Sequence, residues 1–502
     1  MKNDKYSGIL LHPTSLPGNN GIGDLGNESY KFVDFLAETH TKLWQTLPLG
    51  PTGYGDSPYA PRSTFAGNEL LISLELLIEQ GLLLEKDLNN KPLFNPQKID
   101  FGSLINWKIP ILFKAARNFL KEENNEFEEF LKDNSFFLDD YSMFMVLSRK
   151  YNDQRWFSIW DKKYANREKE ALKTLRNEES NQLKIWCVLQ YFFFSQWLKL
   201  KQYANSKGIK IIGDIPIFVA SDSCDTWSDP SLFNLDSEGN FSTVSGCPPD
   251  CFCPTGQLWG NPTYNWEKMK KNNYSWWIKR IKQVAKTCDI LRIDHFRGFE
   301  SYWSIKAGMK DAVKGVWEKG PGYSLFKQIK KEIPNLKIIA EDLGFVTKEV
   351  EELLNKTNYP GMRIQIFGYE MIEGKLNLNN NYLPKNYPYN TVAYTGTHDN
   401  QTLVSWFKSQ DKKVKDLILE YYNTKENEIY DCILLDLFSS KAKYSIIPIQ
   451  DLLKLDDSAR MNTPSTCCDL NWTWRLEKGQ LNQKAIKTLK ILNENSGRNF
   501  IN

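Results

Sequence analysis

The sequence predicts an α/β protein built on a (β/α)8 TIM barrel, with a large helical insertion between strands two and three and further loop-rich insertions. Three observations predict this class. Eight short apolar runs each end in polar residues and a loop, helical patterns lie between several of them, and residues 51–208 separate the second run from the third. Nearly continuous apolar runs suit strands buried on both faces of a parallel sheet. Eight such strands with intervening helices indicate a barrel.

Each predicted strand is an apolar run that stops at hydrogen-bonding or charged side chains. In chain order the runs are 8–16, 43–50, 209–219, 290–296, 336–344, 362–368, 391–400 and 444–453. The clearest amphipathic helices between them are expected at 27–40 and 347–357.

We expect a single catalytic barrel over residues 1–502 that carries two insertions. Residues 65–205 are rich in helix formers and predict a mainly helical subdomain, with its aromatic side chains in a core. Residues 220–270 are dense in Pro, Gly, Asp and Trp and predict a loop region that covers the substrate.

Composition argues against several classes of partner. The net charge of +3 gives no case for nucleic acid. No apolar run reaches the roughly 18 residues of a membrane span, and the N-terminal apolar stretch is too short for a secretion signal. The odd number of cysteines, nine, favours a reduced cytoplasmic protein. Nothing indicates an obligate protein partner.

A cysteine cluster raises the question of a metal. Cys247, Cys251 and Cys253 are spaced C-x3-C-x-C, which is not a standard zinc pattern, and no histidine lies nearby. Free thiols in a loop are the favoured interpretation. The sequence contains neither HxH nor HExxH, so we expect no metal and no cofactor.

Aromatic residues make up 13% of the chain and include 16 Trp, several of them beside Pro, Gly and Asp in predicted loops. Exposed aromatics in loops are more often binding surfaces than core. Carboxylates end several strands, where the active site of a barrel lies. Glycosidic-bond chemistry needs one carboxylate at the anomeric carbon and another to protonate the leaving oxygen. The candidates are Asp214, Asp294, Glu341, Asp342 and Asp399.

Asp294 is the candidate nucleophile. Arg292 lies two residues earlier and shares its face of the strand, so its guanidinium should lower the pKa of Asp294. The alternative is a structural Arg–Asp pair. Glu341, delivered by an apolar strand, is the candidate general acid, and its alternative is a buried, hydrogen-bonded glutamate. Asp342 should face the other way and be structural.

Asp399 is a third carboxylate, which we expect to grip sugar hydroxyls and favour a distorted ring. Its alternative is an Asx turn or a helix cap. Of the four histidines, His12, His295 and His398 lie at predicted strand ends, which argues for hydroxyl recognition.

The sequence also resembles the 4-α-glucanotransferases of glycoside hydrolase family 77, nearly from end to end. The matching motifs are "GILLHPTSLPG", "GIGDLG", "WQTLPLGPTGYGDSPY", "GDIPIFVASDSCDTW", "PPDCFCPTGQLWGNPTYNW", "LRIDHFRG", "IIAEDLG", "PGMRIQIFG", "YTGTHDN", "RMNTPST" and "NWTWR". Two departures are Cys251, where many members have an aromatic, and Ser465, where the family has Gly.

The resemblance implies a retaining double displacement that moves segments of 1,4-α-glucan to the 4-hydroxyl of an acceptor glucan or glucose. It makes Asp294 the nucleophile, Glu341 the general acid/base and Asp399 the transition-state stabiliser. It implies maltooligosaccharide contacts from Ser57, Tyr59, Asp214, Trp259, Arg292, His295 and His398, and from Tyr54 at a more distant stretch of glucan.

Three rival classes stay open from the sequence. A hydrolase of similar fold would use the same carboxylates but release sugars to water. A non-catalytic sugar-binding protein would keep the aromatics without needing three strand-end acids. A metal-dependent enzyme would lose activity with a chelator.

Overall fold

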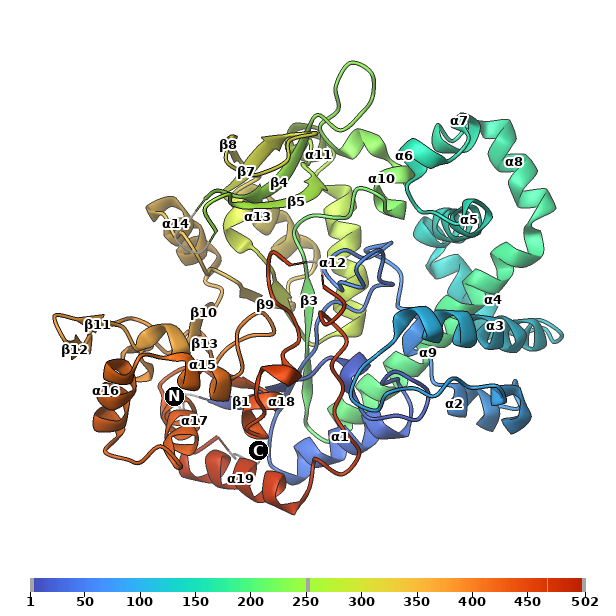
Figure 1. The fold of residues 1–502 in the computed structure, drawn as a ribbon. Helices are drawn as coiled ribbons and strands as arrows, with labels where there is room; N and C mark the ends of the chain where they lie inside the picture. Colours follow the sequence, from blue (N-terminus) through green and yellow to red (C-terminus); the bar gives the residue numbers. More distant parts are fainter. Residues whose placement is uncertain (1–3, 250–252, 467, 499–502) are drawn as a thin grey trace.

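Eight parallel strands form one sheet in the computed structural model, which describes residues 4–249, 253–466 and 468–498. Neighbours in the sheet follow chain order, with β10-β13-β14-β1-β2-β3-β6-β9 as the sequence of strands (Figure 1). The strands are β1 (Tyr6–Leu10), β2 (Leu43–Gln45), β3 (Lys210–Ile215), β6 (Ile290–Ile293), β9 (Lys337–Ala340), β10 (Gly361–Ile364), β13 (Thr391–Tyr394) and β14 (Tyr444–Pro448). Each overlaps one of the eight predicted runs, so the predicted barrel is confirmed.

The two edges of this sheet approach each other. The backbone N–H of Ala340 in β9 donates to the carbonyl of Pro360, just before β10, at 3.0 Å. Between β1 and β2 the backbones pack closely, because a Cβ on Gly8 would lie only 2.8 Å from the Cβ of Leu43. The sheet is therefore nearly closed into a barrel, and all its strands end on one rim.

Helices surround the barrel. They include α1 (Asn27–Glu38), α9 (Ser180–Ser206), α12 (Ser275–Thr287), α13 (Tyr323–Glu332), α14 (Lys348–Thr357), α15 (Leu403–Ser409), α16 (Lys412–Tyr422), α17 (Ile429–Ser439), α18 (Ile449–Leu452) and α19 (Gln483–Asn495). Residues 365–390, all described, contain no α-helix between β10 and β13, only 3-10 turns and the hairpin of β11 (Met371–Ile372) and β12 (Lys375–Leu376).

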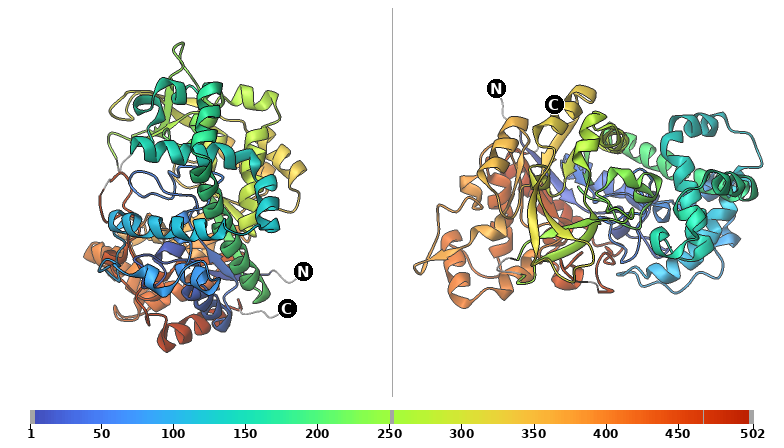
Figure 2. Two further views of the ribbon diagram at one scale, coloured as in Figure 1. Left: turned by 90° about the vertical axis from the view of Figure 1, so that its right-hand side faces the viewer. Right: turned by 90° about the horizontal axis from the view of Figure 1, so that it is seen from above.

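A group of helices between β2 and β3 projects to one side of the barrel (Figure 2). Its aromatic side chains pack among themselves, with Tyr141 and Trp186 almost fully buried. The last helix, α9, also packs on α1 and β3. The helices before α9 are α2 (Leu74–Glu79), α3 (Phe101–Phe119), α4 (Asn125–Asp133), α5 (Ser135–Tyr151), α6 (Trp156–Ile159), α7 (Lys162–Ala165) and α8 (Lys169–Glu178).

Residues 220–270 contain more regular structure than a loop region. They hold α10 (Cys224–Ser228), α11 (Trp266–Lys271) and two strands of an antiparallel sheet, ordered β5-β4-β7-β8. The strands are β4 (Thr243–Cys247), β5 (Gln257–Pro262), β7 (Ser301–Lys306) and β8 (Gly315–Lys319). Cys251, part of the cysteine cluster, lies outside the described residues. Among the described helices, none is long and apolar enough to cross a membrane.

Candidate functional site

Strand register brings the two central carboxylates to one level. Ile293 of β6 pairs with Ala340 of β9, so the next residues, Asp294 and Glu341, follow at adjacent strand ends. The N–H of Glu341 donates to the carbonyl of Ile293 at 3.0 Å, which extends the pairing up to the rim. Neighbouring strands lie about 4.8 Å apart, so this register places the two acids close together.

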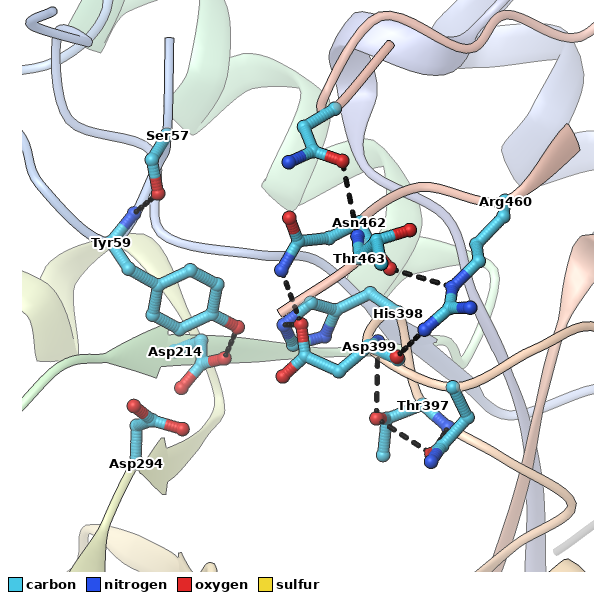
Figure 3. A network of polar contacts seen from close by, with 12 residues as sticks. Ser57, Tyr59, Asp214, Asp294, Thr397, His398, Asp399, Arg460, Asn462 and Thr463 are labelled. Atoms are coloured by element: carbon cyan, nitrogen blue, oxygen red, sulfur yellow. Dashed lines mark hydrogen bonds and ion pairs between the residues drawn. The ribbon is translucent and has the colours of Figure 1, made fainter. Parts of the chain in front are cut away.

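Arg292 links two carboxylates at the barrel mouth. Its Nη1 lies 2.6 Å from Asp214 Oδ2 and its Nη2 lies 3.0 Å from Asp294 Oδ1. Asp214 also accepts a 2.7 Å hydrogen bond from the Tyr59 hydroxyl (Figure 3). Arg292 and Asp214 are buried, whereas 28% of the Asp294 side chain is accessible. Asp214 is thus the structural partner of the arginine, and Asp294 keeps an open face.

The net pKa shift of Asp294 runs opposite to the one predicted from Arg292 alone. Enclosure at the base of the site raises the pKa of Asp294 well above its usual value, and nearby Glu341 and Asp214 add to this. Arg292 lowers it, as predicted, but does not outweigh the burial. The sequence revealed the neighbouring cation, but it could not show how far solvent is excluded.

Glu341 is held by two backbone donors. The N–H of His295 donates to Oε2 at 2.7 Å and the N–H of Leu343 donates to Oε1 at 2.8 Å. Burial raises the pKa of Glu341, while Arg292 and these two N–H groups oppose the rise. The Glu341 carboxyl group is therefore hydrogen-bonded, as expected for a buried structural glutamate. Its pKa is also raised, which is the direction that a general acid needs.

Asp342 points to the other face, as expected. It accepts a 2.6 Å hydrogen bond from the N–H of Met362 and pairs with Arg363 at 3.4 Å, so it joins β9 to β10.

Asp399 faces the mouth from a loop after β13. Its Oδ1 accepts a 2.7 Å hydrogen bond from Asn462 Nδ2 and lies 3.4 Å from His398 Nε2 (Figure 3). The local turn and cap belong to other residues, because Asn400 accepts from the N–H of Thr397 and the Thr402 side chain caps α15. The Asp399 carboxylate, whose side chain is 43% accessible, therefore forms neither the Asx turn nor the helix cap.

Rings line the site on two sides. Tyr59 stacks on His398 with centroids 5.0 Å apart and planes 13° apart, and Trp472 lies 5.9 Å from Tyr59. Trp259 of β5 meets His295 edge-on at 4.9 Å. Burial lowers the pKa of His295 to about 3 and also lowers that of His398, so both imidazoles are neutral near pH 7.

The remaining predicted contacts stand apart from the carboxylates. Ser57 Oγ accepts a 3.2 Å hydrogen bond from the N–H of Tyr59, so it shapes the Tyr59 turn (Figure 3). Tyr54 is 88% exposed and is not drawn into the network.

Sequence reasoning missed the segment that holds Asp399. Asn462 binds its carboxylate, Arg460 Nη2 donates to its backbone carbonyl at 2.6 Å, and Trp472 packs behind Tyr59 and His398. These residues follow no predicted strand end. The signal for them was the resemblance, because the motifs "RMNTPST" and "NWTWR" contain Arg460, Asn462 and Trp472.

A parallel barrel whose mouth gathers carboxylates, neutral histidines and exposed rings has the groups required by enzymes that act on glycosidic bonds. A sequence model of the family described as 4-alpha-glucanotransferase matches residues 11–482. The chain belongs to the 4-alpha-glucanotransferase family, glycoside hydrolase family 77, as the resemblance had implied.

Individual relatives agree over nearly the full length. The chain is 45% identical over 481 residues to the 4-alpha-glucanotransferase of Streptococcus pneumoniae, covering 95% of this chain and 94% of the relative. Identity to the Clostridium butyricum 4-alpha-glucanotransferase is 45% over 492 residues, covering 97% and 100%. The amylomaltase of Streptococcus agalactiae, solved with acarbose, superposes with a TM-score of 0.94 at 41% identity, covering 99% and 100%.

Proposed function

We propose that this protein transfers segments of 1,4-α-glucan to the 4-hydroxyl of an acceptor glucan or glucose. Asp294 is the nucleophile, Glu341 the general acid and base, and Asp399 the transition-state stabiliser. The observation that carries the proposal is the pairing of Asp294 and Glu341 at one level of adjacent strands, with Arg292 against the first. Retention requires carboxyl groups about 5–5.5 Å apart, which this register favours.

In the first step the bridging oxygen takes a proton from Glu341 while Asp294 attacks the anomeric carbon. The C–O bond to the leaving chain breaks, and an ester to Asp294 forms with inversion. Arg292 supports this step because its charge favours the ionised form of Asp294 against burial. The leaving chain departs as an alcohol with the proton from Glu341.

In the second step Glu341 removes the proton from the incoming 4-hydroxyl, whose oxygen displaces Asp294 with a second inversion. Repulsion between neighbouring carboxylates is mutual, so the neutral ester of Asp294 relieves it. The pKa of Glu341 then falls, which makes its ionised, proton-accepting form more available. The backbone N–H groups of His295 and Leu343 also favour that form.

Sugar recognition is assigned to the walls of the site. Tyr59 and Trp259 offer apolar ring surface, and the neutral side chains of His295 and His398 offer hydrogen bonds to hydroxyls. Asp214 contributes through the buried end of the network, Ser57 through the Tyr59 turn, and exposed Tyr54 to a more distant stretch of glucan.

Region 220–270, which carries Trp259, would cover the bound chain. Covering the site would favour transfer over hydrolysis by excluding water.

The test is incubation of the pure protein with maltotriose, with free glucose and product masses followed over time. Glucose plus a ladder of longer maltooligosaccharides, absent in Asp294→Asn, supports the proposal and the nucleophile together. Glucose and maltose without longer chains would make the protein a hydrolase. A ladder that persists in Asp294→Asn would keep the transferase but remove Asp294 from its role.

A further inference from the structure

We propose that Trp317 and Phe345, with Arg297 between them, form an accessory binding site for the part of the 1,4-α-glucan that extends beyond the sugars at the carboxylates. We call these three residues the aromatic shelf. The inference rests on the proposed function and concerns longer substrates only.

The shelf presents large apolar side chains to solvent. Phe345 is 72% exposed and Trp317 is 41% exposed, and neighbouring Val346 is also exposed. Exposed rings that gather around one side chain mark binding surfaces more often than isolated exposed residues do.

Arg297 joins the two rings into one unit. Its guanidinium lies 3.9 Å from the centroid of the Trp317 ring and 6.0 Å from that of Phe345. Its Nη1 also donates a 2.9 Å hydrogen bond to the carbonyl of Phe345. One face of Trp317 is therefore covered by the cation, and the Phe345 loop is tied to the end of β6 rather than being independent of it.

Two of the three shelf residues, Arg297 and Phe345, follow the same strand ends as the catalytic candidates. Arg297 follows Asp294 by three residues and Phe345 follows Glu341 by four, so each lies within about 11–14 Å of chain from its acid. The Glu341 side chain accepts from Leu343 N–H in the same loop. In Figure 1, α14, which follows this loop, lies below β8, which carries Trp317. A glucan held at the acids can continue onto the shelf.

The rim of the shelf suits a sugar rather than a purely apolar ligand. Arg297 Nη2 donates to Ser301 Oγ at 3.3 Å, Ser301 donates to Glu300 at 2.5 Å, and Lys319 pairs with Glu300. A glucose unit has apolar C–H faces that stack on rings and hydroxyl edges that need polar partners. Rings with a hydrogen-bonding border provide for both.

The experiment compares kcat/KM for maltotriose and maltoheptaose in wild type, Phe345→Ala, Phe345→Tyr and the control Phe157→Ala. Phe157 is an exposed aromatic on α6 in the helical insertion. We expect Phe345→Ala to lower the maltoheptaose value about 2- to 10-fold, the effect of one aromatic contact, and to leave the maltotriose value within twofold. Phe345→Tyr should keep the wild-type kcat/KM for maltoheptaose, and Phe157→Ala should change kcat/KM for neither substrate.

Direct binding separates this inference from the proposed function. In the Asp294→Asn background, adding Phe345→Ala should weaken calorimetric binding of maltoheptaose but not of maltotriose. Equal losses for both substrates, or none for maltoheptaose, would overturn the shelf while a wild-type ladder still stands. A wild type that makes no ladder would instead overturn the proposed function. The effect of Phe345→Ala on binding of maltoheptaose and maltotriose would then be the only test of the shelf.

Discussion

The hydrogen bond from Asn462 to Asp399 offers a direct test of how the third carboxylate is positioned. Asn462→Ala removes a 2.7 Å N–H···O bond and leaves the 3.4 Å contact of His398 with that oxygen. A hydrogen bond to a charged group contributes about 1.5–3 kcal/mol. Because 43% of the Asp399 side chain is accessible, water replaces part of it, and about 1–2 kcal/mol remains.

If Asp399 acts mainly in the transition state, that energy corresponds to a loss of about 5- to 30-fold in kcat/KM for maltotriose, measured as the initial rate of glucose release. Asn118→Ala is the matched control, because Asn118 Nδ2 makes one 2.9 Å bond to a carbonyl in the helical insertion. A kcat/KM within twofold of wild type for Asn462→Ala, with Asp399→Asn inactive, would refute the positioning argument.

Three further predictions follow from the geometry. The rate should fall as the pH drops through the raised pKa of Asp294, above the usual value of about 4, and Arg292→Gln should move this acid limb of the kcat/KM profile to higher pH because the opposing charge is gone. Gly298→Ala places a Cβ 2.8 Å from His295 Cδ2 and should cost about 1–3 kcal/mol, visible as lower kcat/KM and lower thermal stability. Ser465 has a φ of 63°, so Ser465→Gly should raise the stability by about 0.5 kcal/mol in thermal unfolding.

The barrel was predictable because its strands carry their own signal. Most of their residues are buried, so each sequence is mainly apolar and stops where the rim begins, as in β6 before Asp294 and β9 before Glu341. The second sheet carried no such signal. β4 contains Gly and Ser, and its partner β7 lies far along the chain, so neither alternation nor a short hairpin turn identified it.

The same contrast separates the acids from the groups that hold them. Asp294 and Glu341 inherit their positions from strand register, which a sequence can indicate. Their pKa values also depend on enclosure by distant segments. Arg292 lowers the pKa of Asp294 as predicted, but burial, which the sequence did not show, outweighs it.

The Asp399 side of the site depends on the last part of the chain. Asn462 and Trp472 lie in a segment fixed by long-range backbone bonds, among them Leu476 N–H to the Ser15 carbonyl at 2.8 Å. Arg475 secures the same segment by donating from Nη2 to the Gly18 carbonyl at 2.7 Å. The proposed nucleophile and the proposed acid therefore follow barrel strands, while the third carboxylate is supported by a C-terminal segment that is hydrogen-bonded to the N-terminal loop. Loosening that segment should displace Asp399 before it disturbs the other two acids. Activity should therefore be lost at a lower denaturant concentration than the one that unfolds the barrel.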